Sequence, residues 1–151
     1  TGRNGVSCNG GSAMRFDDAV MLDLTAGQGR PQLSLFRVDP VSLPLRFGML
    51  ERHALSSQTF VPFPARRFLL IVAPPGDAPA AGAVRAFITD GRQGVHYARG
   101  VWHHPALALD EQTDFIVIGR AACEVDCDVF AFDTEMVVAG PPAPSLAAWN
   151  R

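Results

Sequence analysis

Imidazole, carboxylate and amide side chains gather in two short segments that lie far apart in the chain. These groups are Glu51, His53 and Gln58 in the first segment, and His96, His103 and His104 in the second. Such groups can move protons, hydrogen-bond to a polar ligand or hold a divalent cation. Both segments fall in strand-like sequence and end beside turn signals, so we expect them to meet in one pocket inside a β-barrel.

Short apolar runs separated by Gly, Pro and Asp predict the strands that position these groups. No helical period is convincing, so the pattern favours one all-β domain, a sandwich or barrel. The expected strands are 19–24, 32–38, 45–53, 59–61, 68–73, 84–89, 94–97, 101–104, 114–119, 127–131 and 135–138.

Side-chain alternation within these strands predicts which groups face the cavity. On 45–53, Glu51 and His53 share a face with Phe47 and Met49, so an apolar end lies in the core and a polar end opens into a cavity. His103 and His104 are adjacent and point opposite ways, and the spacing favours His103 in the cavity.

Other strands give further expectations. Runs 68–73 and 115–118 are apolar on both faces and are expected to be central strands. On 84–89, Val84, Ala86 and Ile88 form a core face, which places Arg85 on the face toward solvent, a partner or the cavity.

Composition narrows the class of protein. The chain has 151 residues and a net charge of −2, which suits one domain and gives no electrostatic case for nucleic acid or anionic lipid. We expect a flexible segment over 1–12, a catalytic domain over 13–140 and a Pro/Ala-rich tail over 141–151. No apolar run is long enough to span a membrane and no signal region is seen, so a cytoplasmic protein is expected.

Two further counts restrict the chemistry. Lysine is absent, which excludes a lysine Schiff base, whereas arginine remains available for a carboxylate. Cys8, Cys123 and Cys127 form an odd set, which favours a reducing compartment and ordinary thiols over disulfides or a cysteine metal site.

The polar segments have a spacing similar to that of cupin barrels, which carry the motifs H-x-H-x(3–4)-E and P-x-G-x-x-H. The corresponding positions here read Glu51-x-His53-x4-Gln58 and Ala98-x-Gly100-x-x-His103. The set Glu51, His53, Gln58 and His103 could hold a divalent cation through oxygen and imidazole ligands. It could equally serve without metal as an acid–base pocket.

A wider resemblance is carried by segments 50–62, 85–97, 100–105 and 114–118, which occur in the same order as in the ureidoglycolate lyase (ureidoglycolate hydrolase) family of the cupin superfamily. The resemblance runs from about residue 9 to residue 138. The chain departs from the family at Ala54 (usually Pro), at His96 (usually Asn) and over 119–127, and an amino-terminal strand and helix are missing.

The resemblance implies a cupin-type β-barrel and a carbon–nitrogen lyase of the amidine-lyase class. Such an enzyme cleaves (S)-ureidoglycolate to glyoxylate and urea in allantoin and purine catabolism. It also implies a cytoplasmic homodimer that acts on a small ureido acid, with a divalent metal, nickel among the candidates, and no organic cofactor. Two alternatives stay open, namely another metal-dependent cupin enzyme and a non-catalytic cupin that binds a small acid.

The resemblance also suggests roles for particular residues. We expect His53 or His103 to remove the hydroxyl proton, with Glu51 orienting that histidine or acting as the acid. The substrate-binding residues are expected to be Gln58, Arg85, Tyr97 and Trp102. Gln58 and Arg85 would hold the urea and carboxylate groups, and the two aromatic rings would close the pocket.

Overall fold

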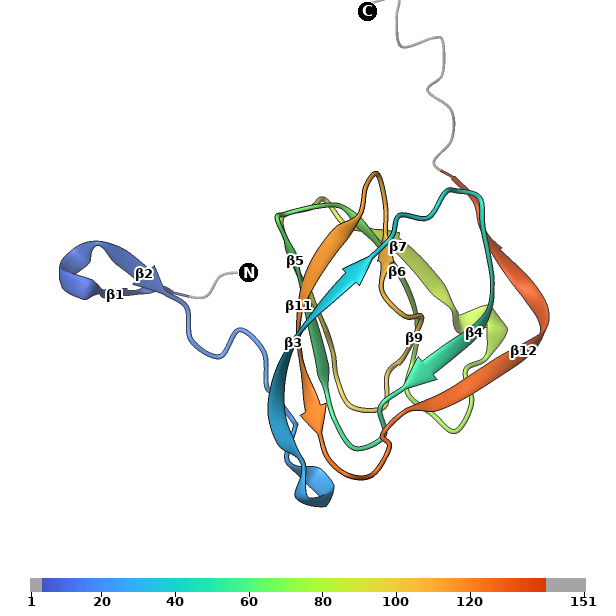
Figure 1. Cartoon of the computed structure of the whole chain (residues 1–151), viewed down its shortest axis with the longest axis horizontal. Helices are drawn as coiled ribbons and strands as arrows, with labels where there is room; N and C mark the ends of the chain where they lie inside the picture. Colours follow the sequence, from blue (N-terminus) through green and yellow to red (C-terminus); the bar gives the residue numbers. More distant parts are fainter. Residues whose placement is uncertain (1–3, 141–151) are drawn as a thin grey trace, which may run out of the picture.

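The structure, a computed structural model, describes residues 4–140. The predicted tail over 141–151 therefore lies outside the described residues. The described chain contains strands and three short 3-10 segments, and the predicted all-β jelly-roll fold is confirmed (Figure 1). The elements are β1 (Val6–Cys8), η1 (Asn9–Gly11), β2 (Ala13–Arg15), η2 (Ala26–Gln28), β3 (Arg30–Val38), β4 (Leu45–Arg52), β5 (Gln58–Phe63), β6 (Phe68–Ala73), η3 (Ala81–Ala83), β7 (Arg85–Ile88), β8 (Val95–Tyr97), β9 (Trp102–His103), β10 (Leu107–Ala108), β11 (Thr113–Ala121) and β12 (Asp128–Val138).

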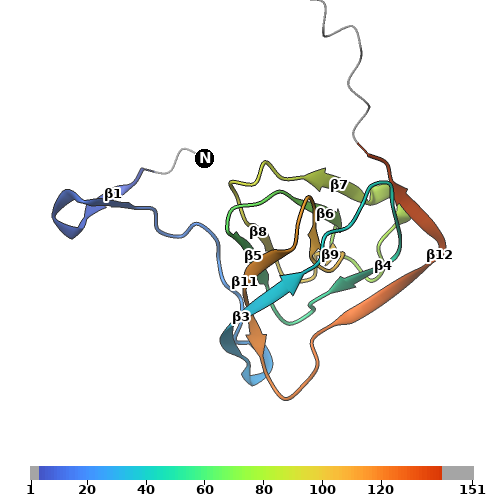
Figure 2. The same cartoon turned by 45° about the horizontal axis from the view of Figure 1, so that its top comes forward.

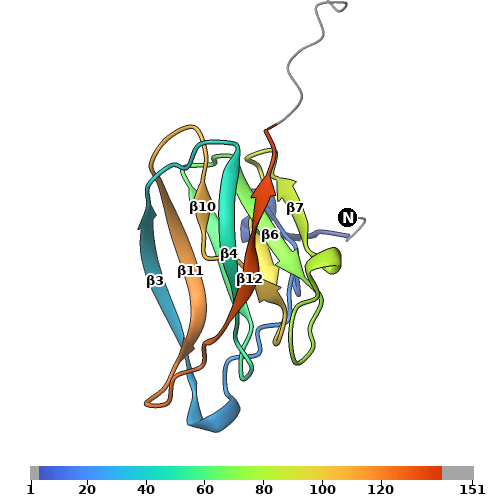
Figure 3. The same ribbon diagram turned by 90° about the vertical axis from the view of Figure 1, so that its right-hand side faces the viewer.

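Two antiparallel sheets form the body of the molecule. The larger has the order β10-β6-β9-β4-β12, and β7 also pairs with β6. The smaller has the order β3-β11-β5-β8. Figures 1 and 3 show the two sheets facing each other as a closed sandwich. The polar segments predicted to meet lie on β4 and β9, which are neighbours in the larger sheet, where Glu51 pairs directly with His103.

Successive side chains of β6 enter two different apolar clusters, as expected for a strand apolar on both faces. Phe68 packs with Phe60, Tyr97, Phe115 and Val117, in the cluster that includes the inner face of the smaller sheet. Leu69 and Ile71 instead pack in a cluster that contains Leu50, Trp102 and Leu107. β9 pairs with β4 and β6 and buries Trp102 in the second cluster, which fixes the direction of its side chains.

Several boundaries differ from the sequence prediction. Residues 19–24 form no strand, although Leu24 is buried. Segments 127–131 and 135–138 join into β12, whose pairing with β4 shifts between Ala131 and Met136. The short strand β10 was not predicted. The predicted domain boundary at residue 12 falls inside a hairpin that β1 and β2 form. No helix among residues 4–140 has the length and apolar character needed to cross a bilayer.

Candidate metal centre

Glu51, His53 and His103 converge at one point, although they come from separate segments of the chain. Glu51 is on β4, His53 directly follows β4, and His103 is on β9. One potential ligand atom from each lies within 4.8 Å of the other two. Glu51 Oε1 is 3.5 Å from His103 Nε2, and the two imidazole ring centroids are 5.4 Å apart. The predicted convergence of the two segments is thus found.

Main-chain carbonyls determine which nitrogen of each imidazole carries the proton. The Nδ1–H of His53 donates to the carbonyl oxygen of Asp126, and the Nδ1–H of His103 donates to that of Val101 at 3.0 Å. A carbonyl can only accept, so each ring in its neutral form keeps a lone pair on Nε2. Both Nε2 atoms are buried and find no hydrogen-bond partner among the described residues.

Burial keeps His103 neutral at physiological pH. Its side chain is 1 % exposed. Burial is the main cause that lowers the pKa of His103 to about 4, with smaller lowering effects of His53 and His104, against the opposing effect of the hydrogen bond to Val101. Tyr97 stacks on the imidazole at 4.1 Å between centroids, and burial followed by the Glu51 charge raises the pKa of the tyrosine hydroxyl. His103 Nε2 therefore acts as an acceptor beside the carboxylate of Glu51.

Three acceptor atoms that lie close to one another, with no donor between them, could hold a cation. Two imidazole nitrogens and a carboxylate oxygen suit divalent transition metals such as zinc, nickel or iron. The hydrogen bonds from Nδ1 to main-chain carbonyls are those that usually orient metal-binding histidines. The residues present therefore fit a divalent metal, which supports the metal-binding prediction without identifying the ion.

A polar cavity of about 180 Å³ opens beside this cluster. His53 and Gln58 both line it, and Gln58 Oε1 is buried without a partner among residues 4–140. The other walls come from the loop after His53 and from the inner faces of β3 and β11, with the lining residues Gln32, Ser34, Phe36, Ser56, Ser57, Val117, Gly119 and Arg120. The space next to His53 thus has hydroxyl and amide groups on its walls together with the apolar side chains of Phe36 and Val117.

Sequence reasoning missed Asp126, which organises one wall of this cavity. Its carbonyl accepts the His53 proton, and its carboxylate accepts hydrogen bonds from Leu55 N at 2.8 Å and Ser56 Oγ at 2.7 Å. The neighbouring Cys127 thiol donates to Glu51 Oε2 at 3.7 Å. Burial, and then the Glu51 charge, raise the pKa of this thiol. The only sequence signal was their position before the last strand.

Two predicted substrate-binding residues lie away from the cluster. Trp102 is 2 % exposed in the apolar core and donates from Nε1 to Gly76 O at 3.0 Å, because on β9 it points opposite to His103. Arg85 is exposed on the edge strand β7, where its Nη1 donates to the carbonyls of Gly82 and Val84. It lines a separate apolar cleft of about 610 Å³, and Tyr97 forms part of the wall of that cleft. His104 packs edge-on against Phe47, away from His103, as the alternation predicts.

Fold and site together define an all-β jelly-roll protein with a partly buried Glu–His–His cluster that could hold a metal ion, beside a small cavity. A family model described as ureidoglycolate lyase matches residues 1–139. Curated relatives named ureidoglycolate lyase include one from Pseudomonas fluorescens (strain SBW25), 45 % identical over 127 residues, which are 84 % of this chain and 76 % of that protein.

Another relative, from Pseudomonas putida (strain W619), is 45 % identical over 130 residues, covering 86 % of this chain and 78 % of that protein. A solved dTDP sugar isomerase from Desulfovibrio desulfuricans G20 aligns over 86 % of this chain and 81 % of its own, with a TM-score of 0.48 and 14 % identity. The family model and the curated relatives establish that the chain belongs to the ureidoglycolate lyase family.

Proposed function

We propose that this chain is a ureidoglycolate lyase, a cupin-type enzyme that cleaves (S)-ureidoglycolate to glyoxylate and urea. The observation that carries the proposal is the Glu51–His53–His103 centre, in which both Nε2 atoms lack a donor, beside a small cavity in a chain of this family. The substrate is a small hydroxy acid with a ureido group on the hydroxyl-bearing carbon, and it needs polar walls and a positive charge.

The reaction requires one proton to move between two atoms on the same carbon. The O–H bond and the C–N bond break, a carbonyl forms at the hydroxyl oxygen, and the departing urea nitrogen gains a proton. No water is consumed. The site must therefore bind the carboxylate, accept the hydroxyl proton and return a proton to nitrogen.

We propose that Glu51, His53 and His103 hold a divalent cation, and nickel is the ion we propose by analogy with the family. When bound, the ion would supply positive charge for the substrate carboxylate and hydroxyl and would lower the pKa of that hydroxyl. The three side chains need no rearrangement of their hydrogen bonds to do this, because both Nε2 lone pairs are already free.

Glu51 is then the residue that moves the proton. Both imidazoles already use Nδ1 for main-chain carbonyls and would use Nε2 to hold the ion, which would leave them no basic nitrogen. The second Glu51 oxygen, Oε2, meets the Cys127 thiol and can take the hydroxyl proton and deliver it to the departing nitrogen. In a metal-free site His53 Nε2, which lies at the cavity wall, would be the base instead.

The remaining residues position the substrate. Gln58 would bind the ureido group through its amide, whose oxygen is buried and unpaired among the described residues. Tyr97 would act indirectly, by fixing the plane of His103 through stacking. Arg85 and Trp102 take no part in this proposal, because Arg85 lines a different cleft and Trp102 points into the apolar core, away from His103. We also propose that the enzyme acts in the cytoplasm in allantoin and purine catabolism and that it is a homodimer.

A coupled assay for glyoxylate and urea from racemic ureidoglycolate tests the function directly, with and without a chelator. We expect equimolar products, loss of activity with the chelator and recovery on adding nickel. Glu51→Gln should lower kcat by about 10²–10⁴, the range for positioned acid–base catalysis. Cys123→Ser, at an exposed cysteine that has no contact with Glu51, is the control and should stay within a few-fold.

Other outcomes separate the alternatives. Activity that survives complete metal removal would assign the base to His53 and remove the metal from the proposal. Binding of glyoxylate without any turnover of ureidoglycolate would instead identify a non-catalytic acid-binding protein. Tight metal binding with no release of urea would indicate a different enzyme of the same fold.

A further inference from the structure

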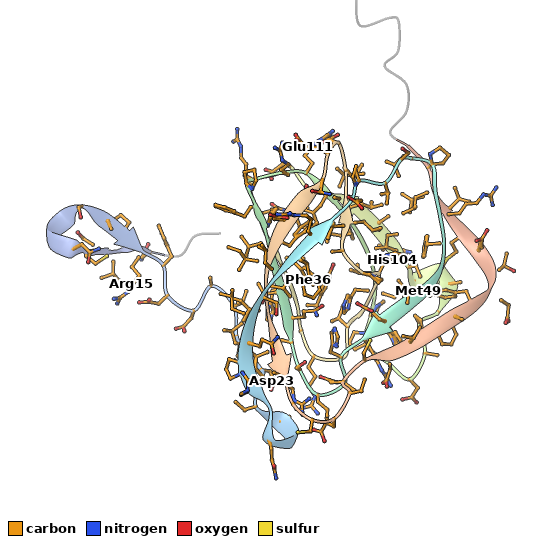
Figure 4. All side chains as sticks on the ribbon, viewed as in Figure 1. Arg15, Asp23, Phe36, Met49, His104 and Glu111 are labelled. Carbon is orange, nitrogen blue, oxygen red and sulfur yellow. The ribbon has the colours of Figure 1, made fainter. Side chains whose placement is uncertain are left out.

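The apolar cleft beside Arg85 lies where an edge of the larger sheet meets an edge of the smaller one. Within residues 4–140, β7 pairs only with β6 and β8 only with β5, so both are edge strands. Figure 2 shows β7 and β8 on the same side of the barrel, and residues of both strands line the cleft. The polar cavity of the proposed active site lies against β3, where Figure 4 labels Phe36. The cleft is therefore a separate concave site.

The walls of this cleft are mostly apolar. They include Leu70 and Val72 of β6, Phe87 of β7, Val95 of β8 and Val101. Phe87 is 55 % exposed, although it belongs to a concave apolar surface. The volume of the cleft, about 610 Å³, falls in the range of about 300–1,000 Å³ that is usual for sites that bind small molecules. The shape and the exposed ring suit a small ligand with an apolar body.

Arg85 brings a positive charge to the cleft, and no acid neutralises it. Arg85 and Phe87 lie on the same face of β7, because Ala86 separates them. Arg85 Nη1 donates to the carbonyl oxygens of Gly82 and Val84 at 2.8 Å each, which orients the guanidinium. Within residues 4–140 Arg85 forms no ion pair, and no Asp or Glu is among the described residues that line the cleft. The Nε–Nη2 edge of Arg85, which makes no hydrogen bond to the described part of the chain, matches the geometry of a carboxylate.

The other polar side chains of the cleft are neutral at physiological pH. Burial lowers the pKa of His96, whose Nδ1 lies 2.8 Å from Thr59 Oγ1. Burial also raises the pKa of the Tyr97 hydroxyl. A ligand with one negative charge can place it on Arg85, whereas a second charge on the ligand would lie in apolar surroundings without a partner. The cleft therefore favours a monocarboxylate over a dicarboxylate or a phosphate.

Two residues of the cleft also orient the imidazole of His103. The Tyr97 ring stacks on it, with 4.1 Å between ring centroids and 13° between ring planes. The carbonyl oxygen of Val101 accepts the Nδ1–H of His103 at 3.0 Å. Both Tyr97 and Val101 line the cleft. A ligand in the cleft is thus separated from His103 by one layer of packed groups, through which coupling can pass.

We propose that this cleft binds a small monocarboxylate with an apolar body. The carboxylate pairs with Arg85, and the apolar body lies on Phe87. Binding is transmitted to the His103 imidazole through Tyr97 and Val101. The proposal goes beyond the lyase activity, since ureidoglycolate has a hydroxyl and a ureido group but no apolar body. Its tests use the metal-free chain without substrate, so they stand or fall independently of catalysis.

Isothermal titration calorimetry on the full chain tests the class of ligand, with octanoate as the probe and 1-octanol as its uncharged counterpart. We expect octanoate to bind at least about tenfold more tightly than 1-octanol, because only the acid forms charge-assisted hydrogen bonds. Arg85→Gln should remove this preference, and Phe87→Ser should weaken both ligands. Arg92→Gln is the matched control, since Arg92 is an exposed arginine outside the cleft, and it should change neither affinity. Absence of octanoate binding, or equal affinity for the acid and the alcohol, overturns the proposal.

NMR of the imidazole nitrogens tests the transmission to His103. We expect saturating octanoate to shift the Nδ1 and Nε2 signals of His103. The signals of His104, which packs against Phe47 instead, should stay in place. In Arg85→Gln the same octanoate concentration should leave His103 unshifted. Octanoate that binds the native chain without moving the His103 signals would refute the transmission.

Discussion

His103 should make the metal-free protein sensitive to acid, and the size of the effect follows from its burial. In the unfolded chain this histidine titrates near 6.5, whereas in the folded chain its pKa is about 4. Between these two pKa values His103 is protonated in the unfolded chain but not in the folded chain, so acidification favours unfolding. His103 therefore contributes stability that is complete above pH 6.5 and is lost as the pH falls toward 4. At about 1.4 kcal/mol per pH unit the loss is about 3 kcal/mol.

The assay compares the native chain with His103→Gln, which keeps a polar side chain that does not titrate. Urea unfolding followed by circular dichroism, in the presence of a chelator, would give the free energy of unfolding from pH 7 to pH 4. Every other titrating group is common to both chains, so the difference between the two profiles reports His103 together with its effect on the neighbouring Glu51 and His53. We expect the native chain to lose about 3 kcal/mol more than the variant over this range. Parallel profiles, within about 0.5 kcal/mol, would show that the imidazole is not held in its neutral form by burial.

Three further outcomes are expected. Nickel added to the metal-free chain at 100 times its dissociation constant should stabilise the folded state by about 2.7 kcal/mol, which would be seen as a higher Tm. His53→Ala should remove this stabilisation. An unchanged Tm of the native chain would count against metal binding by Glu51, His53 and His103. Gln58→Ala should raise KM about tenfold with little change in kcat, and a selective loss of kcat would instead make Gln58 part of the chemistry. Leu24→Ala should lower the free energy of unfolding by about 2–5 kcal/mol in urea, because Leu24 is 2 % exposed. A change below about 1 kcal/mol would mean that burial of the Leu24 side chain does not stabilise the fold.

Alternation along strands was enough to predict much of the fold and the centre of the site. It placed Glu51 and His53 on one face and separated His103 from His104, because neighbouring side chains on a strand must point to opposite sides. The two central apolar strands were found for the same reason. Periodicity failed at 19–24, because this segment forms no strand although its last residue, Leu24, is buried.

The parts of the site that were not predicted depend on which strands pair with one another, and local sequence does not show this pairing. Arg85 was expected near the ligand, but its strand lies at an edge of the larger sheet and lines a different cleft. Trp102 shares a strand with His103, and the same alternation that favoured His103 should have excluded it. Asp126 supports the site partly through its carbonyl group, which every residue has, so its side-chain type gave no warning of that role.

The Nδ1–H groups of His53 and His103 donate to the peptide oxygens of Asp126 and Val101, and not to side chains. Replacing one amino acid by another does not delete a peptide oxygen, so no point substitution in the surrounding shell can simply switch off either tautomer. Evolution could retune these rings only by shifting the loop path itself, through insertions, deletions or altered turns. Drift in residue type around the centre should therefore be tolerated far better than any change in the length of the connection before the last strand.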